Sequence, residues 1–134
     1  MRKVLVDTSI IIEFQRRSDE ERGKTVLVKL IKSDFELAYS ILTYFEIYSG
    51  RSVWEKEKAR QTVDTVFEGG QILALDASIA LKAGGLRARL GLSAMDALIA
   101  ATALHHQLPL VTFNRKDFAQ VPSLELFEGP QQSP

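Results

Sequence analysis

The stretch KVLVDTSIII, residues 3–12, decides the fold because it joins a buried strand to a buried helix through one acidic residue. After Lys3, residues 4–6 are all aliphatic, and the segment 3–6 is too apolar for a strand with one face in water, which predicts a buried strand of a parallel sheet. Asp7 then interrupts the apolar run. A carboxylate among buried aliphatic side chains costs free energy unless a partner compensates it. Asp7 therefore either satisfies backbone donors at a turn or binds a cation.

The composition is that of one ordinary globular domain. The chain has 134 residues, of which 46% are hydrophobic and 25% charged, enough for one compact core. The absence of cysteine excludes a disulfide framework, a thiolate nucleophile and a cysteine-bound zinc. The net charge is +0, so a nucleic-acid role requires local basic patches or a metal site. No stretch approaches the ~18 apolar residues of a membrane span, and no signal-peptide cleavage pattern occurs, so we expect a cytoplasmic protein.

Apolar strands alternate along the chain with segments of helical periodicity. The predicted strands cover residues 3–6, 35–40, 71–75, 110–113 and 124–127, and the predicted helices cover 10–15, 20–32, 43–50, 53–67, 77–90 and 93–106. Strands separated by helices predict an α/β fold with a parallel sheet covered on both faces. We expect one domain over residues 1–128 and a loose tail over 129–134, whose sequence has too little apolar content to pack.

Two further acidic residues stand in helical segments, and each has a structural explanation. Asp96 lies in the helix predicted over 93–106, which is apolar on all sides, so its carboxylate has no solvated face. Ser93 and Asp96 also match a capping box, as do Thr43 and Glu46, and for Asp96 the residues leave capping and a ligand role equally open. For Glu46, judged from the residues, a solvated cap is the better explanation.

Polar residues also follow the strand predicted at 110–113, where ordinary turn chemistry explains them equally well. In a parallel sheet, however, the carboxyl ends of the strands meet at one edge. The positions expected to converge there are Asp7, Glu46, Asp96, Asn114 and Asp117. Clustered carboxylates raise one another's pKa or bind a cation, and a set of oxygen ligands favours Mg²⁺ or Mn²⁺ over zinc.

Four segments together resemble the PIN domain, and more narrowly the VapC toxins of bacterial and archaeal toxin–antitoxin pairs. In chain order they are VLVDTS, TYFEIYSG, SAMDALIAATAL and LVTFNRKDF, and the likeness runs over residues 3–127. The resemblance implies a single three-layer α/β/α domain with a central, mostly parallel sheet, and Mg²⁺-dependent endoribonuclease activity on RNA. It also implies a VapB-type antitoxin and a homodimer formed through helices. The aromatic residues that either supply such surfaces or belong to the core are Tyr44, Phe45, Tyr48 and Trp54.

The resemblance places the family's first three acids at Asp7, Glu46 and Asp96. Asp7 and Asp96 are then expected to bind the metal, with Glu46 as a further ligand or as a carboxylate that orients water. Asn114 stands where many PIN domains have a fourth acid, and Asp117 follows three residues later, so we expect one bound ion rather than two. The hydroxyl positions expected to support the acids are Thr8 or Ser9, and Thr112.

Basic residues near the predicted site are candidate contacts to RNA phosphates. They are Arg16, Arg17, Arg51, Arg115 and Lys116. Arg51 and Arg115 are the preferred pair, although charges of both signs are interleaved in this chain and most such charges are simply solvated.

Other functions have sequence requirements that can be checked. A phosphoacceptor receiver domain or a haloacid-dehalogenase-type phosphatase needs a second acid close to Asp7, where this chain has Thr8 and Ser9. A PIN-like module that binds RNA or protein without cutting it fits the neutral net charge and Asn114. A PIN nuclease of RNA maturation carries the same residues as a toxin, so the sequence leaves both open.

Overall fold

The structure, a computed structural model, describes residues 2–129 of the chain. Its strands are β1 (Lys3–Val6), β2 (Glu36–Ser40), β3 (Gly70–Leu73) and β4 (Leu110–Val111). They pair in parallel in the order β3-β2-β1-β4. The predicted parallel sheet is therefore confirmed. The predicted tail over 129–134 lies outside the described residues, apart from Gly129.

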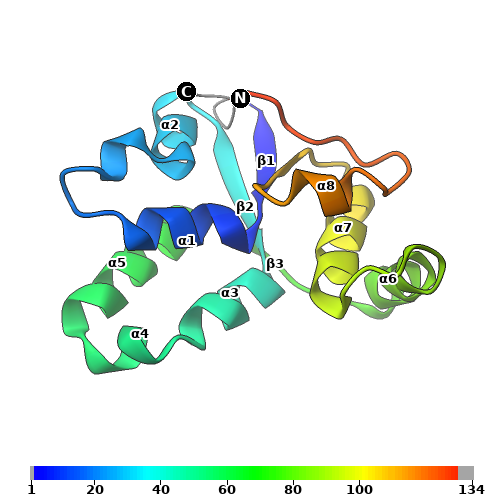
Figure 1. Ribbon diagram of the computed structural model, residues 1–134, viewed down its shortest axis with the longest axis horizontal. Coiled ribbons are helices and arrows are strands. Elements are labelled where there is room, and N and C mark those ends of the chain that lie inside the picture. The colour runs from blue at the N-terminus through cyan, green and yellow to red at the C-terminus, as the bar shows by residue number, and fades with distance from the viewer. Residues whose placement is uncertain (1, 130–134) are drawn as a thin grey trace.

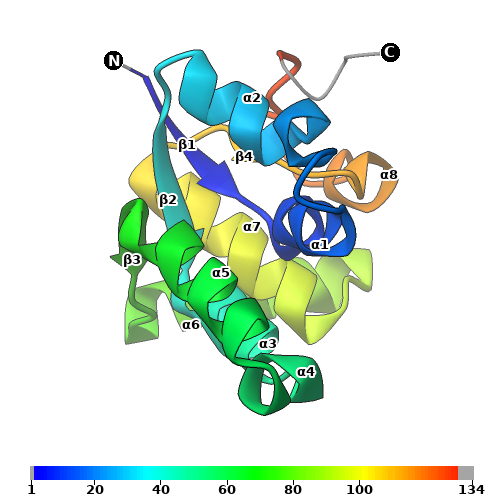
Figure 2. The same ribbon diagram turned by 90° about the vertical axis from the view of Figure 1, so that its left-hand side faces the viewer.

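Helices cover both faces of the sheet, which gives three layers (Figures 1 and 2). On one face lie α1 (Thr8–Arg16), the 3-10 turn η1 (Arg22–Lys24), α2 (Val26–Lys32), α3 (Ile41–Tyr48), α4 (Arg51–Glu55) and α5 (Glu57–Glu68). On the other face lie α6 (Ala77–Leu90), α7 (Ala94–His106) and α8 (Arg115–Phe118). The described part of the chain contains no helix long and apolar enough to cross a membrane.

The opening strand β1 explains the two-sided core. Side chains alternate across a strand, so Val4 and Val6 pack with the α1–α5 layer while Leu5 packs with α6 and α7. All three are fully buried. Burying each aliphatic side chain contributes about 1.5–3 kcal/mol, which is why the three residues of β1 just before Asp7 are all aliphatic.

Two predicted helices are wrong in extent because the backbone becomes extended inside them. The helix predicted over 53–67 is instead α4 and α5, separated at Lys56, whose φ and ψ are −121° and 115°. The helix predicted over 20–32 is reduced to η1 and α2, because Thr25 is extended with φ −75° and ψ 156°. No glycine or proline marks the break at Lys56, whereas Gly23 stands in η1 just before Thr25.

The last two predicted strands are shorter than expected. The strand predicted over 110–113 ends at Val111, because Thr112 already turns toward the polar edge of the sheet. The segment 124–127 contributes only a parallel bridge between Leu126 and Leu110 rather than a strand.

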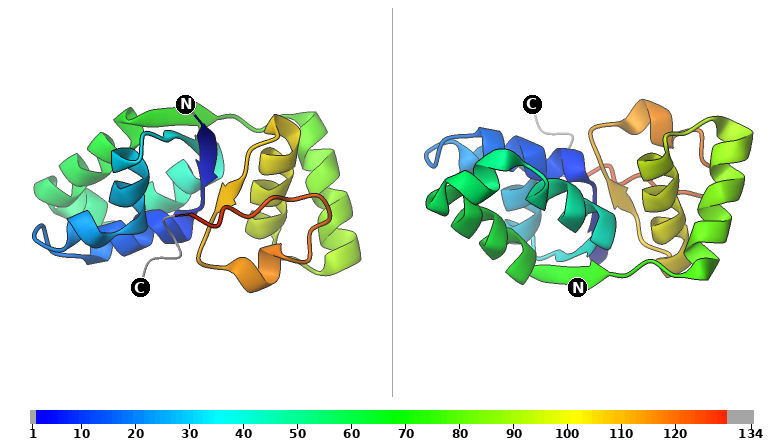
Figure 3. Two further views of the ribbon diagram at one scale, coloured as in Figure 1. Left: turned by 90° about the horizontal axis from the view of Figure 1, so that it is seen from above. Right: turned by 90° about the horizontal axis from the view of Figure 1, so that it is seen from below.

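The carboxyl ends of β1, β2 and β4 lie at the same edge of the sheet and lead into α1, α3 and α8 (Figure 3). Val6 pairs with Val111 in the sheet, and Asp7 N donates to Val111 O at 2.9 Å. This register places Asp7 beside Thr112, the residue that follows β4. The edge is therefore where the predicted polar positions meet.

Candidate active site

Asp7 occupies the N-cap position of α1, but its side chain makes no capping hydrogen bond. Instead its Oδ2 accepts from Ser9 Oγ at 2.9 Å and from Thr112 Oγ1 at 2.7 Å. The residue is only 6% exposed. Within residues 2–129 no donor reaches its other oxygen, Oδ1. A buried carboxylate oxygen without a donor is the kind of atom that a cation satisfies.

A continuous set of hydrogen bonds joins Asp7 to Asp96, although the two residues are far apart in the sequence. Thr112 Oγ1, which donates to Asp7, accepts from Asn114 N at 2.9 Å. Asn114 Nδ2 in turn donates to Asp96 Oδ2 at 3.2 Å. Thr112 is fully buried, so this connection is fixed by the fold rather than by mobile surface side chains. These contacts show that Asp7, Asp96 and Asn114 lie together at the edge of the sheet, where the sequence predicts them to converge.

Asp96 lies in the first turn of α7 and is partly buried. The predicted cap is present, because Ser93 Oγ accepts from Asp96 N at 3.1 Å. Burial raises the pKa of Asp96 above its ordinary value. The negative charges of Asp7, Asp117 and Glu46 raise that pKa further, while the hydrogen bond with Ser93 opposes the shift. Capping and membership of an acidic centre are therefore compatible at this residue.

Glu46 joins the same edge through α1. Thr8 Oγ1 donates to Glu46 Oε1 at 2.7 Å and lies 2.9 Å from Thr43 Oγ1. The capping box predicted for Thr43 and Glu46 is wrong, because α3 begins earlier and its N-cap is Ser40, whose Oγ accepts from Leu42 N. Thr43 is a buried helix residue, and its hydroxyl helps to hold Thr8 against Glu46.

Asp117 and Asn114 take different places at the rim. Asp117 is exposed in the first turn of α8, and its charge contributes to the raised pKa of Asp96. Asn114 precedes α8, and its amide donates to Asp96 rather than capping that helix. We refer to Asp7, Glu46, Asp96 and Asp117 together as the acidic centre.

The two preferred phosphate contacts are not placed alike. Arg115 is engaged elsewhere, since it pairs with Glu128 and its Nη1 donates to Phe127 O at 3.2 Å. Arg51 is exposed at the start of α4, and no contact within the described chain joins it to the acidic centre. The two histidines end α7, ten residues or about 15 Å along the helix axis from Asp96 to His106.

The atoms of the acidic centre that could bind a metal are carboxylate oxygens, which suit a hard divalent cation. Within residues 2–129, however, no three acidic, histidine or cysteine side chains lie close enough together to form a complete metal site. The donor set therefore fits an ion that takes few ligands from the protein and keeps several water molecules, as Mg²⁺ usually does.

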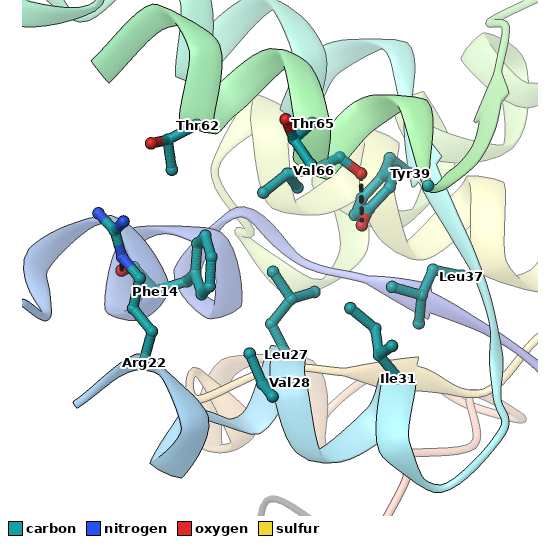
Figure 4. Close-up of a pocket in the computed structure, with 11 residues that line it drawn as sticks. Phe14, Arg22, Leu27, Val28, Ile31, Leu37, Tyr39, Thr62, Thr65 and Val66 are labelled. Atoms are coloured by element: carbon teal, nitrogen blue, oxygen red, sulfur yellow. Dashed lines mark hydrogen bonds between the residues drawn. The ribbon is translucent and has the colours of Figure 1, made fainter. Parts of the chain in front are cut away.

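Two hollows flank α1. The first, about 530 Å³, adjoins the acidic centre at Ser9; we call it the α1 groove, lined by Ser9, Ile12, Glu13, Arg16, Arg17 and Phe113. The second is an apolar cavity of about 320 Å³ between α1, α2 and α5 (Figure 4). Its lining consists of Phe14, Arg22, Leu27, Val28, Ile31, Leu37, Tyr39, Thr62, Thr65, Val66 and Gly69. Within this apolar cavity, Tyr39 Oη donates to Val66 O at 3.3 Å.

Comparison with known families finds one match over most of the chain. The family model described as PIN domain matches residues 4–124. Among curated proteins, Ribonuclease VapC of Rickettsia bellii (strain RML369-C) is 43% identical over 42 residues. That alignment covers 31% of this chain and 31% of the relative, so the match spans less than a third of the curated protein.

Solved structures of toxin–antitoxin proteins share the fold. A toxin–antitoxin complex from Klebsiella pneumoniae contains a chain that is 28% identical with a TM-score of 0.70, covering 90% of this chain and 94% of that chain. VapBC2 from Rickettsia felis, solved with a DNA fragment from its promoter, matches at 23% identity with a TM-score of 0.75. That alignment covers 93% of this chain and 97% of the other, and at this identity it shows the fold alone.

Proposed function

The chain belongs to the PIN domain family, and from this membership and its acidic centre we propose that it is a metal-dependent endoribonuclease acting as a VapC-type toxin. One observation carries the proposal. Asp7, buried with an oxygen that no described donor reaches, is connected through Thr112 and Asn114 to Asp96, whose pKa is raised by burial and by the surrounding carboxylates. Such an arrangement favours a divalent cation over bare negative charge.

The residues that would hold one Mg²⁺, or Mn²⁺, are Asp7 and Asp96. Asp7 supports this role because its Oδ2 is held by two hydroxyl groups and its Oδ1 is left for the ion. Two protein carboxylates and water fit the preference of Mg²⁺ to stay partly hydrated. We propose one ion rather than two, because Asn114 brings no charge and donates its amide to Asp96.

When bound, such an ion lowers the pKa of its water and polarises a phosphoryl oxygen. The chain's own part is positioning. Glu46, whose Oε1 accepts a hydrogen bond from Thr8, would orient water and accept its proton, and Asp117 with Asn114 would complete the rim. His105 and His106 lie at the far end of α7 and are exposed, so a histidine acid–base pair does not serve this centre.

A partner antitoxin accords with the Klebsiella pneumoniae neighbour, which was solved as a toxin–antitoxin complex. We propose that a VapB-type antitoxin covers the acidic centre of this chain and so excludes RNA. Ile31, at the rim of the apolar cavity, is 54% exposed and offers such a partner an apolar anchor beside α1. A homodimer through α3 and α4 is proposed from Phe45 and Trp54, which are 66% and 62% exposed.

Cleavage of RNA by the purified protein tests the activity. Cleavage of a labelled single-stranded RNA is expected with Mg²⁺ and is lost with chelator, in Asp7→Asn and in Asp96→Asn. Asp34→Asn is the matched control, because Asp34 is exposed on the loop before β2. If both active-site variants are folded and cut as fast as the parent, the assignment is wrong.

One observation favours a second candidate, an RNA- or protein-binding module that does not cut: no three metal-binding side chains group together within residues 2–129. Binding of RNA without metal-dependent cleavage would assign this second function.

The genome context decides between a toxin and a nuclease of RNA maturation. A small upstream reading frame whose product copurifies with this chain and inhibits cleavage identifies the toxin.

A further inference from the structure

The α1 groove begins at the acidic centre. Ser9 Oγ donates to Asp7 Oδ2 at 2.9 Å and accepts from Phe113 N at 3.1 Å. One serine hydroxyl therefore connects the buried carboxylate to the backbone of the aromatic residue that lines the groove. A ligand in the α1 groove lies next to any group that reacts at Asp7.

Along its length the groove follows one face of α1. Positions 9, 12, 13 and 16 recur at the spacing of neighbours on a helix surface, and Arg17 follows as the C-cap. At a rise of ~1.5 Å per residue, Arg16 stands about 10 Å along the axis from Ser9. The guanidinium group of Arg16 would thus contact a phosphate next to the one that reacts, rather than the reacting phosphate itself.

Phe113 supplies an aromatic face in the groove. Its residue is 46% exposed, although Val111 and Thr112 just before it are fully buried. The hydrogen bond from Phe113 N to Ser9 Oγ holds the backbone from which the ring projects. Exposed aromatic rings beside a basic groove are how proteins bind single-stranded nucleic acid, because every base has a face that stacks.

The charge of the groove is positive and concentrated at Arg16. The carboxylate of Glu13 already has partners within the chain, since Oε1 accepts a hydrogen bond from Val26 N at 3.0 Å and Oε2 lies 3.7 Å from Arg17 Nη2. Arg16 is exposed and makes no ion pair within the described chain. The groove therefore presents one uncompensated guanidinium group to a ligand.

We propose that the α1 groove is a nucleotide subsite, in which Phe113 stacks on a base beside the cleaved bond and Arg16 binds the neighbouring phosphate. The inference rests on the proposed ribonuclease function and adds residues that set where the RNA lies. It also moves the phosphate contact from Arg115, which is paired with Glu128, to Arg16. Phe113 and Arg16 are positioning residues, since neither contacts the acidic side chains.

Binding of a short fluorescent single-stranded RNA, measured by anisotropy in the uncut Asp7→Asn background, tests the subsite. Phe113→Ala is expected to weaken binding about 5- to 150-fold, the range for loss of one stacked base, and Phe113→Trp to restore it. Arg16→Ala is expected to lower the slope of log K against log salt by about 0.7, and Arg16→Lys to keep it. Leu81→Ala and Arg87→Ala on α6 are the controls for an exposed apolar and an exposed basic side chain.

The same substitutions in the active parent separate this inference from the proposed function. We expect Phe113→Ala and Arg16→Ala to raise KM more than they lower kcat, and Phe113→Ala to change which base flanks the cut. A parent that cuts RNA while both variants bind and cut like the α6 controls overturns the subsite alone. A parent that binds RNA through Phe113 but never cuts it overturns the nuclease and supports the subsite. A parent that binds no single-stranded RNA overturns the subsite, whichever other partner the groove takes.

Discussion

Asp7 and Asp96 belong to one hydrogen-bonded connection, made by Thr112 and Asn114, that spans the edge of the sheet. Each linking residue serves two partners. Thr112 Oγ1 donates to a carboxylate and accepts from a backbone amide, while Asn114 contributes both its backbone and its side-chain nitrogen. The acidic side chains are thus held by the residues just beyond β4.

Thr112→Val should lower both stability and activity. Hydrogen bonds to charged groups contribute about 1.5–3 kcal/mol, and the valine leaves buried Asp7 with one donor fewer. We expect a loss of that size in the free energy of unfolding, measured by urea titration, and a 10- to 100-fold loss of cleavage, as for residues that orient metal ligands. Thr102→Val is the control: Thr102 is equally buried, but its hydroxyl donates to Leu98 O, a backbone carbonyl of its own helix. Equal losses in the two variants would deny Thr112 a special role.

Asp96→Asn should stabilise the metal-free protein at neutral pH. The folded-state pKa of Asp96 is raised above its unfolded value of about 3.9, so its stabilising effect is present below that value and is lost as pH rises through the folded pKa. At pH 7 the ionised group therefore opposes folding, and the amide removes this opposition. We expect a higher Tm for the variant in EDTA at pH 7, with the difference shrinking toward pH 4. A lower Tm at pH 7 would contradict the repulsion inferred here.

Asp64 should behave in the opposite way. The hydrogen bond from Tyr48, followed by that from Arg60, holds the pKa of Asp64 below its usual range. Its contribution is present above the unfolded pKa and is lost as pH falls through the lowered folded value. Asp64→Asn should lower the Tm at pH 7 and match the parent in strong acid. A pH-independent difference would indicate packing rather than charge.

Phe45→Glu should separate the proposed homodimer. A carboxylate placed on a largely exposed aromatic position of α3 would have to be desolvated in the interface. Light scattering after gel filtration should report a dimer for the parent and a monomer for the variant. Leu81→Glu, at an 82% exposed position on α6, is expected to leave the dimer intact. A dimer that survives Phe45→Glu would place the interface elsewhere.

The sequence predicts the meeting of polar residues at one edge of the sheet better than the bounds of the helices around it. Strand ends of a parallel sheet share an edge, which brings Asp7 and Asn114 together, and Asp96 joins them from the first turn of α7. The predicted start of the helix over 43–50 is wrong, because Ser40 ends the buried strand β2 and directly caps α3. The break at Lys56 carries no glycine or proline signal.

The destinations of single side chains also lay beyond the sequence. The Asp7 side chain does not cap α1 but accepts hydrogen bonds from Ser9 and Thr112. Arg115 pairs with Glu128. Both contacts depend on the three-dimensional packing, which the spacing of residues along the chain does not show. The sequence likewise does not show that the Phe113 side chain is exposed. Only its exposure beside Ser9 separates it from a core residue.

Asp7 and Asp96 are proposed to hold one divalent ion between them. A crystal of the full chain grown with Mn²⁺ would show this ion, since manganese is located by its anomalous scattering. We expect one manganese peak bound to the carboxylates of both Asp7 and Asp96, absent from Asp7→Asn crystals grown in the same way. Manganese bound elsewhere, with these two carboxylates free of metal at saturating Mn²⁺, would contradict it.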